Sequence, residues 1–136
     1  MRIVLKWFGI IALVAVIGFS MVGCDLDSYE KLNGDWDRGD IVITFNNDVG
    51  VFTEVKSNNG DWLTTLDSGA IHIGSQKFRK ITKAGDLKWT CQELINDPPT
   101  TTEWKDGTTI TMSSDGKTLE ITNPNITYWS TTYTKK

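Results

Sequence analysis

Residues that could do chemistry are few in this chain of 136 residues, and the sequence does not group them. The only histidine, His72, has no cysteine or carboxylate near it at the spacing of a zinc site. Ser68 lies in a turn-like segment outside the Gly-x-Ser-x-Gly context of a nucleophile elbow. Three neighbouring carboxylates lack the glycine and the distal glutamate of a calcium loop: Asp35, Asp37 and Asp40. We therefore expect no catalytic residues, no metal and no cofactor, and a protein that is not an enzyme.

The first of the two cysteines, Cys24, stands at the end of a segment built like an export signal. Arg2 and Lys6 form a basic lead, and a mostly apolar run follows over residues 7–21. Gly23, a small residue at the end of this segment, precedes Cys24 directly. A basic start, an apolar middle and a small residue at the cleavage point are the parts of a signal peptide. A plain secretory signal and an uncleaved membrane helix stay open, although a span needs about 20 apolar residues.

The string Ser-Met-Val-Gly-Cys at residues 20–24 resembles the lipobox of bacterial lipoproteins. This resemblance implies that residues 1–23 are a signal peptide and that lipidation occurs at Cys24, which would carry a diacylglycerol and an amide-linked acyl chain such as palmitate. More than one chain is needed for stable anchoring, since each buried methylene contributes only about 0.8 kcal/mol. The resemblance places the protein in the bacterial cell envelope, anchored to a membrane and facing the periplasm or the cell surface.

The part of the chain after the signal is long enough for one domain. We expect residues 24–32 to be an acidic tether and residues 33–136 to form the domain. The net charge of the whole chain is −3, and the signal removes only basic residues, so the domain is acidic and a poor partner for nucleic acid. If Cys24 is acylated, Cys91 has no partner, and its alternating surroundings predict a buried structural thiol.

Alternation of apolar and polar residues with a period of two dominates from residue 41 onward, and no stretch shows helical spacing over three turns. About nine strands are expected, at residues 41–45, 51–56, 70–73, 77–81, 87–92, 101–104, 108–112, 118–122 and 127–134, and residues 62–66 could form a further short strand. Asp106-Gly107 and Asp115-Gly116 are typical of hairpin turns. Short connections and the need to remove exposed edges favour an all-β fold, a small antiparallel up-and-down β-barrel of eight or nine strands.

The motif Leu32-x-Gly34-x-Trp36 at the start of this series resembles the G-x-W opening of lipocalins, above all the short lipocalin-like domains of bacterial lipoproteins. The resemblance implies that Gly34 and Trp36 form a structural plug at one end of the barrel. It also implies that Trp36 packs near a basic residue late in the chain, for which Lys135 and Lys136 are available.

Tryptophans supply the candidate binding residues. We expect Trp36 and Trp89 to belong to the core, and Trp62 and Trp104, which lie near loops, to reach a barrel mouth.

The function expected is a binding module for a small apolar or amphipathic ligand. Two alternatives stay open. One is a protein-binding envelope lipoprotein such as a lysozyme-type hydrolase inhibitor, because Ser68-Gly69-Ala70 resembles the Ser-Gly loop of one inhibitor family. The other is a structural envelope component.

Overall fold

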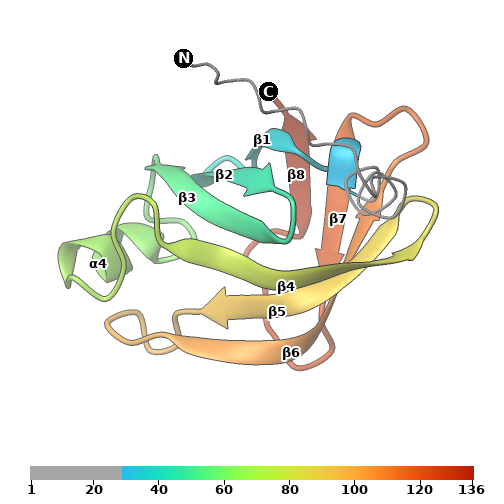
Figure 1. Cartoon of the computed structure of the whole chain (residues 1–136). Coiled ribbons are helices and arrows are strands. Elements are labelled where there is room, and N and C mark those ends of the chain that lie inside the picture. The colour runs from blue at the N-terminus through green and yellow to red at the C-terminus, as the bar shows by residue number, and fades with distance from the viewer. Residues whose placement is uncertain (1–28) are drawn as a thin grey trace, which may run out of the picture.

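The chain folds into a closed barrel of eight antiparallel strands arranged in sequence order, with β8 paired back to β1 (Figure 1). The computed structural model describes residues 29–136, so the predicted signal peptide and Cys24 lie outside the described residues. The predicted up-and-down antiparallel barrel is confirmed. Among residues 29–136, no helix is long and apolar enough to cross a membrane.

The elements follow the chain as β1 (Gly34–Asp37), β2 (Ile41–Asn46), β3 (Val49–Val55), α4 (Trp62–Asp67), β4 (Gln76–Gly85), β5 (Lys88–Ile95), β6 (Glu103–Met112), β7 (Thr118–Thr122) and β8 (Thr132–Lys135). Trp36 pairs with Lys135 where β1 meets β8, and this contact closes the sheet. Closure leaves no exposed edge on which a second chain could pair.

The strand predicted at residues 62–66 is wrong, because this segment forms the helix α4. Trp62 and Thr65 are buried and Leu66 is half-buried, which is the i, i+3, i+4 spacing of a helix rather than alternation. Asn58 also favours the helix, since its Oδ1 accepts a hydrogen bond from the backbone N–H of Thr64 at 3.0 Å. Six residues are too few for a helical period to stand out in the sequence.

The strand predicted at residues 70–73 is also wrong, because this segment is a loop. It lies between Gly69 and Gly74, whose φ values of 85° and 99° interrupt extended backbone at both ends. β3 pairs directly with β4, so no place in the sheet remains for an added strand. Ile71 packs into the core, whereas His72 is exposed.

Residues 101–112 were predicted as two strands joined by a turn at Asp106-Gly107, but β6 runs continuously through this dipeptide. Asp106 and Gly107 together face the single residue Gln92 on β5, which makes a β-bulge, and Gly107 adopts a φ of 92° there. Asp115-Gly116, in contrast, does connect two strands, as predicted. The last predicted strand is too long, because residues 127–131 lie in a loop and only β8 is extended.

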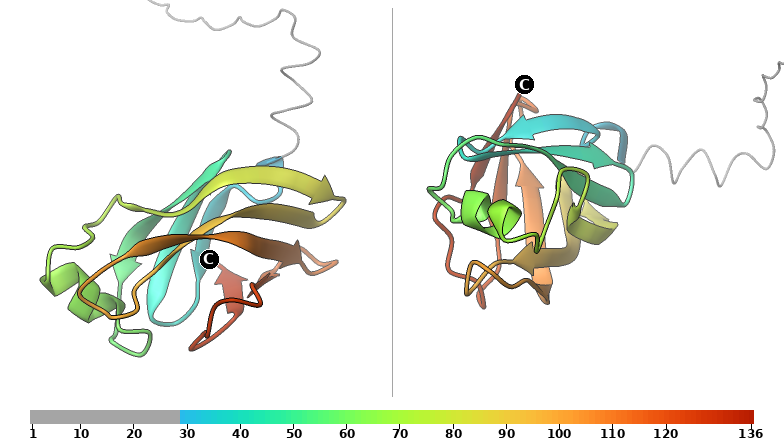
Figure 2. Two further views of the ribbon diagram at one scale, coloured as in Figure 1. Left: turned by 90° about the horizontal axis from the view of Figure 1, so that it is seen from below. Right: turned by 90° about the vertical axis from the view of Figure 1, so that its left-hand side faces the viewer.

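The two ends of the barrel differ. At one end lie the short β2–β3, β4–β5 and β6–β7 turns, together with residues 29–33, and we call it the closed end. The β1–β2, β3–β4, β5–β6 and β7–β8 connections lie at the other end, the mouth, and three of them are long. The right-hand view of Figure 2 looks onto the mouth, with α4 in front of the ring of strands.

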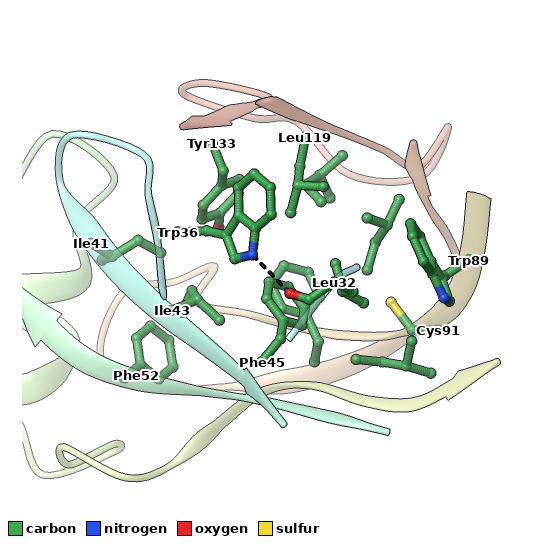
Figure 3. Packing of buried hydrophobic residues seen from close by; sticks show 14 of the residues in the cluster. Leu32, Trp36, Ile41, Ile43, Phe45, Phe52, Trp89, Cys91, Leu119 and Tyr133 are labelled. Atoms are coloured by element: carbon green, nitrogen blue, oxygen red, sulfur yellow. Dashed lines mark hydrogen bonds between the residues drawn. The ribbon is translucent and has the colours of Figure 1, made fainter. Parts of the chain in front are cut away.

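Side chains fill the interior of the barrel between these ends (Figure 3). Aromatic rings dominate: Phe45 stacks on Phe78 with centroids 5.4 Å apart, and Tyr133 meets Phe78 edge-on at 6.3 Å. Trp36 and Trp89 are fully buried, as predicted, and Cys91 is buried with 7% of its surface exposed. An eight-stranded barrel has an interior about wide enough for its own side chains.

Trp36 lies at the closed end, where residues that were assigned to the tether also pack. The indole Nε1 of Trp36 donates a hydrogen bond to the carbonyl oxygen of Leu32 at 2.8 Å (Figure 3). Lys135 Nζ lies 4.9 Å from the centroid of the Trp36 ring. Leu32 is fully buried, and the hydroxyl of Tyr29 donates to the carbonyl oxygen of Ile81 at 2.8 Å. The packed domain thus extends back at least to residue 29.

We expect Trp36→Ala to lower the free energy of unfolding by roughly 3–5 kcal/mol, the cost of removing a buried aromatic ring. Urea denaturation followed by circular dichroism measures this loss. Trp129→Ala is the matched control, because that side chain is 50% exposed and its removal should cost much less. Equal losses in the two variants would contradict the assignment of Trp36 to the core.

Candidate functional site

A pocket of about 400 Å³ lies at the mouth of the barrel. Four connections and the ends of two strands form it, so residues far apart in the sequence meet there. The lining residues are Arg38, Asn59, Gly60, Asp61, Trp62, Lys77, Glu93, Ile95, Asn96, Asp97, Pro99, Asn125, Ile126, Thr127, Tyr128 and Trp129. This volume is within the range of small-molecule sites, roughly 300–1,000 Å³.

One buried ion pair, between Arg38 and Asp40, belongs to the floor of the pocket. Arg38 Nε donates to Asp40 Oδ1 at 2.8 Å and Arg38 Nη2 donates to Asp40 Oδ2 at 2.7 Å, a two-pronged arrangement that only arginine can make. Asp40 is fully buried, and Arg38 is nearly so. Although burial acts to lower the pKa of Arg38, its interactions with Tyr133 and Asp40 raise that pKa above its ordinary value.

A second buried ion pair, between Lys77 and Glu93, ties three strands and the β7–β8 loop together. Lys77 Nζ donates to Glu93 Oε2 at 2.8 Å and to the carbonyl oxygen of Leu94 at 2.7 Å. The other carboxylate oxygen, Oε1, accepts from Thr108 at 2.9 Å and from the hydroxyl of Tyr128 at 2.7 Å. Burial lowers the pKa of Lys77, and the attraction of Glu93 only partly offsets that effect.

Two tyrosines lie beside these charges. Burial and the charge of Glu93 raise the pKa of Tyr128, which therefore stays protonated and donates its hydrogen bond. Burial likewise raises the pKa of Tyr133. The Tyr133 hydroxyl is buried and has no hydrogen-bond partner among residues 29–136, so the ring contributes packing rather than a polar link.

Trp62 and Trp129 form aromatic surfaces of the pocket, and each already lies beside a cation. Lys77 Nζ is 4.9 Å from the ring centroid of Trp62, which also packs on Phe52 at 4.8 Å between centroids. Arg38 Cζ is 6.0 Å from the ring centroid of Trp129. Trp62 is buried, whereas Trp129 is half exposed at the entrance.

Of the two tryptophans predicted to bind ligand, Trp62 lines this pocket and Trp104 does not. Trp104 lies on β6, where the guanidinium carbon of Arg79 is 3.9 Å from its ring centroid. Sequence reasoning missed Trp129, because residues 127–134 alternate well enough to predict an extended strand. Asn123-Pro124-Asn125 was the available signal, since a turn there sends the next residues across the mouth.

The other chemically capable residues are dispersed. Asp35 accepts a hydrogen bond from Thr44, and Asp37 pairs with Lys56, whose Nζ is 2.5 Å from its carboxylate. The part of the chain that the structure describes holds no group of three histidine, cysteine or acidic side chains arranged to bind a metal. Burial and nearby Glu93 raise the pKa of the Cys91 thiol, which disfavours a reactive thiolate.

No protein-family model, curated protein or solved structure matches this chain. The functional inference therefore depends on the geometry of the pocket at the mouth.

Removal of one partner of the Lys77–Glu93 pair should lower the stability of the domain. We expect Glu93→Leu to lower the free energy of unfolding by roughly 3–5 kcal/mol, because it leaves an uncompensated buried ammonium. The double variant Lys77→Met/Glu93→Leu should recover much of this loss, since no buried charge then lacks a partner. Urea denaturation of Glu93→Leu, Lys77→Met and the double variant measures the coupling energy between the two residues. Additive losses would contradict the pairing described here.

Proposed function

We propose that this protein is a membrane-anchored lipoprotein of the bacterial envelope whose lipocalin-like barrel binds a small amphipathic ligand at its mouth and catalyses no reaction. The observation that carries the proposal is the contrast between a filled barrel interior and a pocket of about 400 Å³ at one end. The barrel cannot hold a long apolar chain along its axis without displacing its own core. The mouth, in contrast, offers both aromatic surface and polar groups.

The charges of the pocket support binding rather than catalysis. Arg38 and Lys77 are each engaged by a buried carboxylate, and Glu93 accepts hydrogen bonds from three side chains. A general base needs a lone pair directed at substrate, and a nucleophile needs a base beside it. These ion pairs hold the strand ends and the mouth loops in place, which pre-forms the pocket.

The position of the N-terminal end of the described chain supports anchoring. Tyr29 packs at the closed end, opposite the mouth, and Cys24 precedes it by only a short segment. A lipid on Cys24 would hold the barrel to the membrane by its closed end. The mouth would then face away from the membrane, where a soluble ligand can enter it.

We expect Cys24→Ala to abolish incorporation of labelled palmitate and to release the protein from the membrane fraction, or to leave it unprocessed. The physical reason is that the acyl chains supply the binding energy for the bilayer. Metabolic labelling with palmitate and fractionation of the cells measure both effects, with Cys91→Ala as the matched cysteine control. Wild-type labelling and membrane partition of Cys24→Ala would refute the anchor.

A bulky side chain in the pocket should exclude the ligand. We expect wild-type protein purified from its native membrane to carry a small molecule in native mass spectra, and Thr127→Trp to carry less of it. Thr101→Trp is the control, because Thr101 is also an exposed loop threonine but does not line the pocket. If the wild type and both variants carry equal amounts of the small molecule, it binds outside this pocket. If the wild type carries no small molecule, that result counts against the binding function.

A protein-binding role, such as inhibition of a lysozyme-type hydrolase, and a purely structural role in the envelope both stay predictions.

A further inference from the structure

We propose that the ligand of the mouth pocket is a neutral saccharide, a mono- or disaccharide unit whose ring packs against Trp129. This inference rests on the proposed binding function and goes further by naming the chemical class of the ligand. Three features of the pocket carry it: an exposed aromatic ring at the entrance, polar side chains with no hydrogen-bond partner among residues 29–136, and the balance of charge.

Trp129 is the aromatic surface that a ligand would meet first. Three large apolar side chains are exposed among residues 29–136: Leu63 at 37%, Ile73 at 52% and Trp129 at 50%. Only Trp129 of these lines the pocket. A half-exposed tryptophan beside a concave site offers apolar surface to a ligand, since small-molecule pockets are lined by aromatic side chains together with a few polar groups. The apolar face of a sugar ring is a flat partner of matching size.

Solvent-exposed polar side chains surround the same space. Asp61, Asp97 and Asn125 line the pocket and are exposed, and their side chains make no hydrogen bond to residues 29–136, so a ligand can take the place of water on them. Carboxylates accept hydrogen bonds, and an amide both donates and accepts. Sugar hydroxyls also donate and accept, so these three groups can be satisfied together by one polyhydroxylated ligand. An alkyl chain would instead remove the carboxylates from water with no compensation.

The balance of charge disfavours ionic ligands. Arg38 and Lys77, the two cations of the lining, are neutralised by Asp40 and Glu93. Asp61 and Asp97 are then in excess, so the pocket repels a phosphate or a carboxylate. Asp61 and Asp97 would attract a cationic ligand, but Arg38 and Lys77, which lie beside the Trp129 and Trp62 rings, would repel it at the aromatic surfaces. A neutral ligand meets neither penalty.

Isothermal titration calorimetry of the mature protein at pH 7 tests the inference with four kinds of probe. The neutral probes are glucose, galactose and N-acetylglucosamine with the disaccharides maltose, lactose and chitobiose. Glucuronate is the anionic probe, glucosamine is the cationic probe, and laurate, itself an anion, is the probe with an alkyl chain. We expect at least one neutral probe to bind more tightly than all three of the others.

Trp129→Ala should weaken that binding by about tenfold or more, because the stacking surface is lost. Asn125→Ala, which removes one open amide, should weaken it less. Ile73→Ala is the matched control, since this equally exposed apolar residue lies outside the pocket and its removal should leave binding unchanged. Circular dichroism of each variant verifies the native fold.

The possible outcomes separate this inference from the proposed function. Binding of a neutral saccharide that Trp129→Ala does not weaken would overturn the site. Tighter binding of laurate, glucosamine or glucuronate through Trp129 would overturn the saccharide class and leave the binding function intact. If no probe binds, the saccharide class fails, and the native mass spectra of the wild type then decide whether the binding function fails with it.

Discussion

The small diameter of the closed barrel is the constraint on which the rest of this structure depends. Eight antiparallel strands that close on themselves leave an interior just wide enough for side chains to fill it. Here aromatic and branched residues occupy that space, with Phe45 stacked on Phe78 and Trp36 buried at one end. Because the interior is full, a concave site can form only where the strands end and the connections are long.

The mouth is also where the barrel accommodates charge. Two ion pairs, Arg38–Asp40 and Lys77–Glu93, are buried within a few residues of strand ends. Moving a charge out of water costs free energy unless an ionic partner and further hydrogen bonds compensate for the lost hydration. The Asp40 carboxylate meets this condition with two hydrogen bonds from the Arg38 guanidinium, and Glu93 meets it with Lys77, Thr108 and Tyr128. The result is a rigid polar base beneath a pocket whose rim consists of loops.

Comparison of two similar dipeptides shows how far local sequence decides local structure. Asp106-Gly107 and Asp115-Gly116 both predict a hairpin, and in both the glycine adopts a positive φ. Asp115-Gly116 reverses the chain, whereas Asp106-Gly107 forms a bulge within β6. The side chain of Asn123 is part of the reason, since its Nδ2 donates to the carbonyl oxygen of Asp106 and to Thr108 Oγ1. That contact comes from the β7–β8 connection, which no local pattern encodes.

The sequence by itself determined that the chain forms antiparallel strands and that Trp36 and Trp89 are buried. Alternation with a period of two and the placement of glycine are local properties, so they can be read without knowing the fold. Only the tertiary structure decided that residues 62–67 form a helix, that Trp104 lies against Arg79 and that Trp129 stands at the mouth. Each of these depends on what a segment meets across the barrel. A pocket formed by four separate connections exists only once the strands have closed.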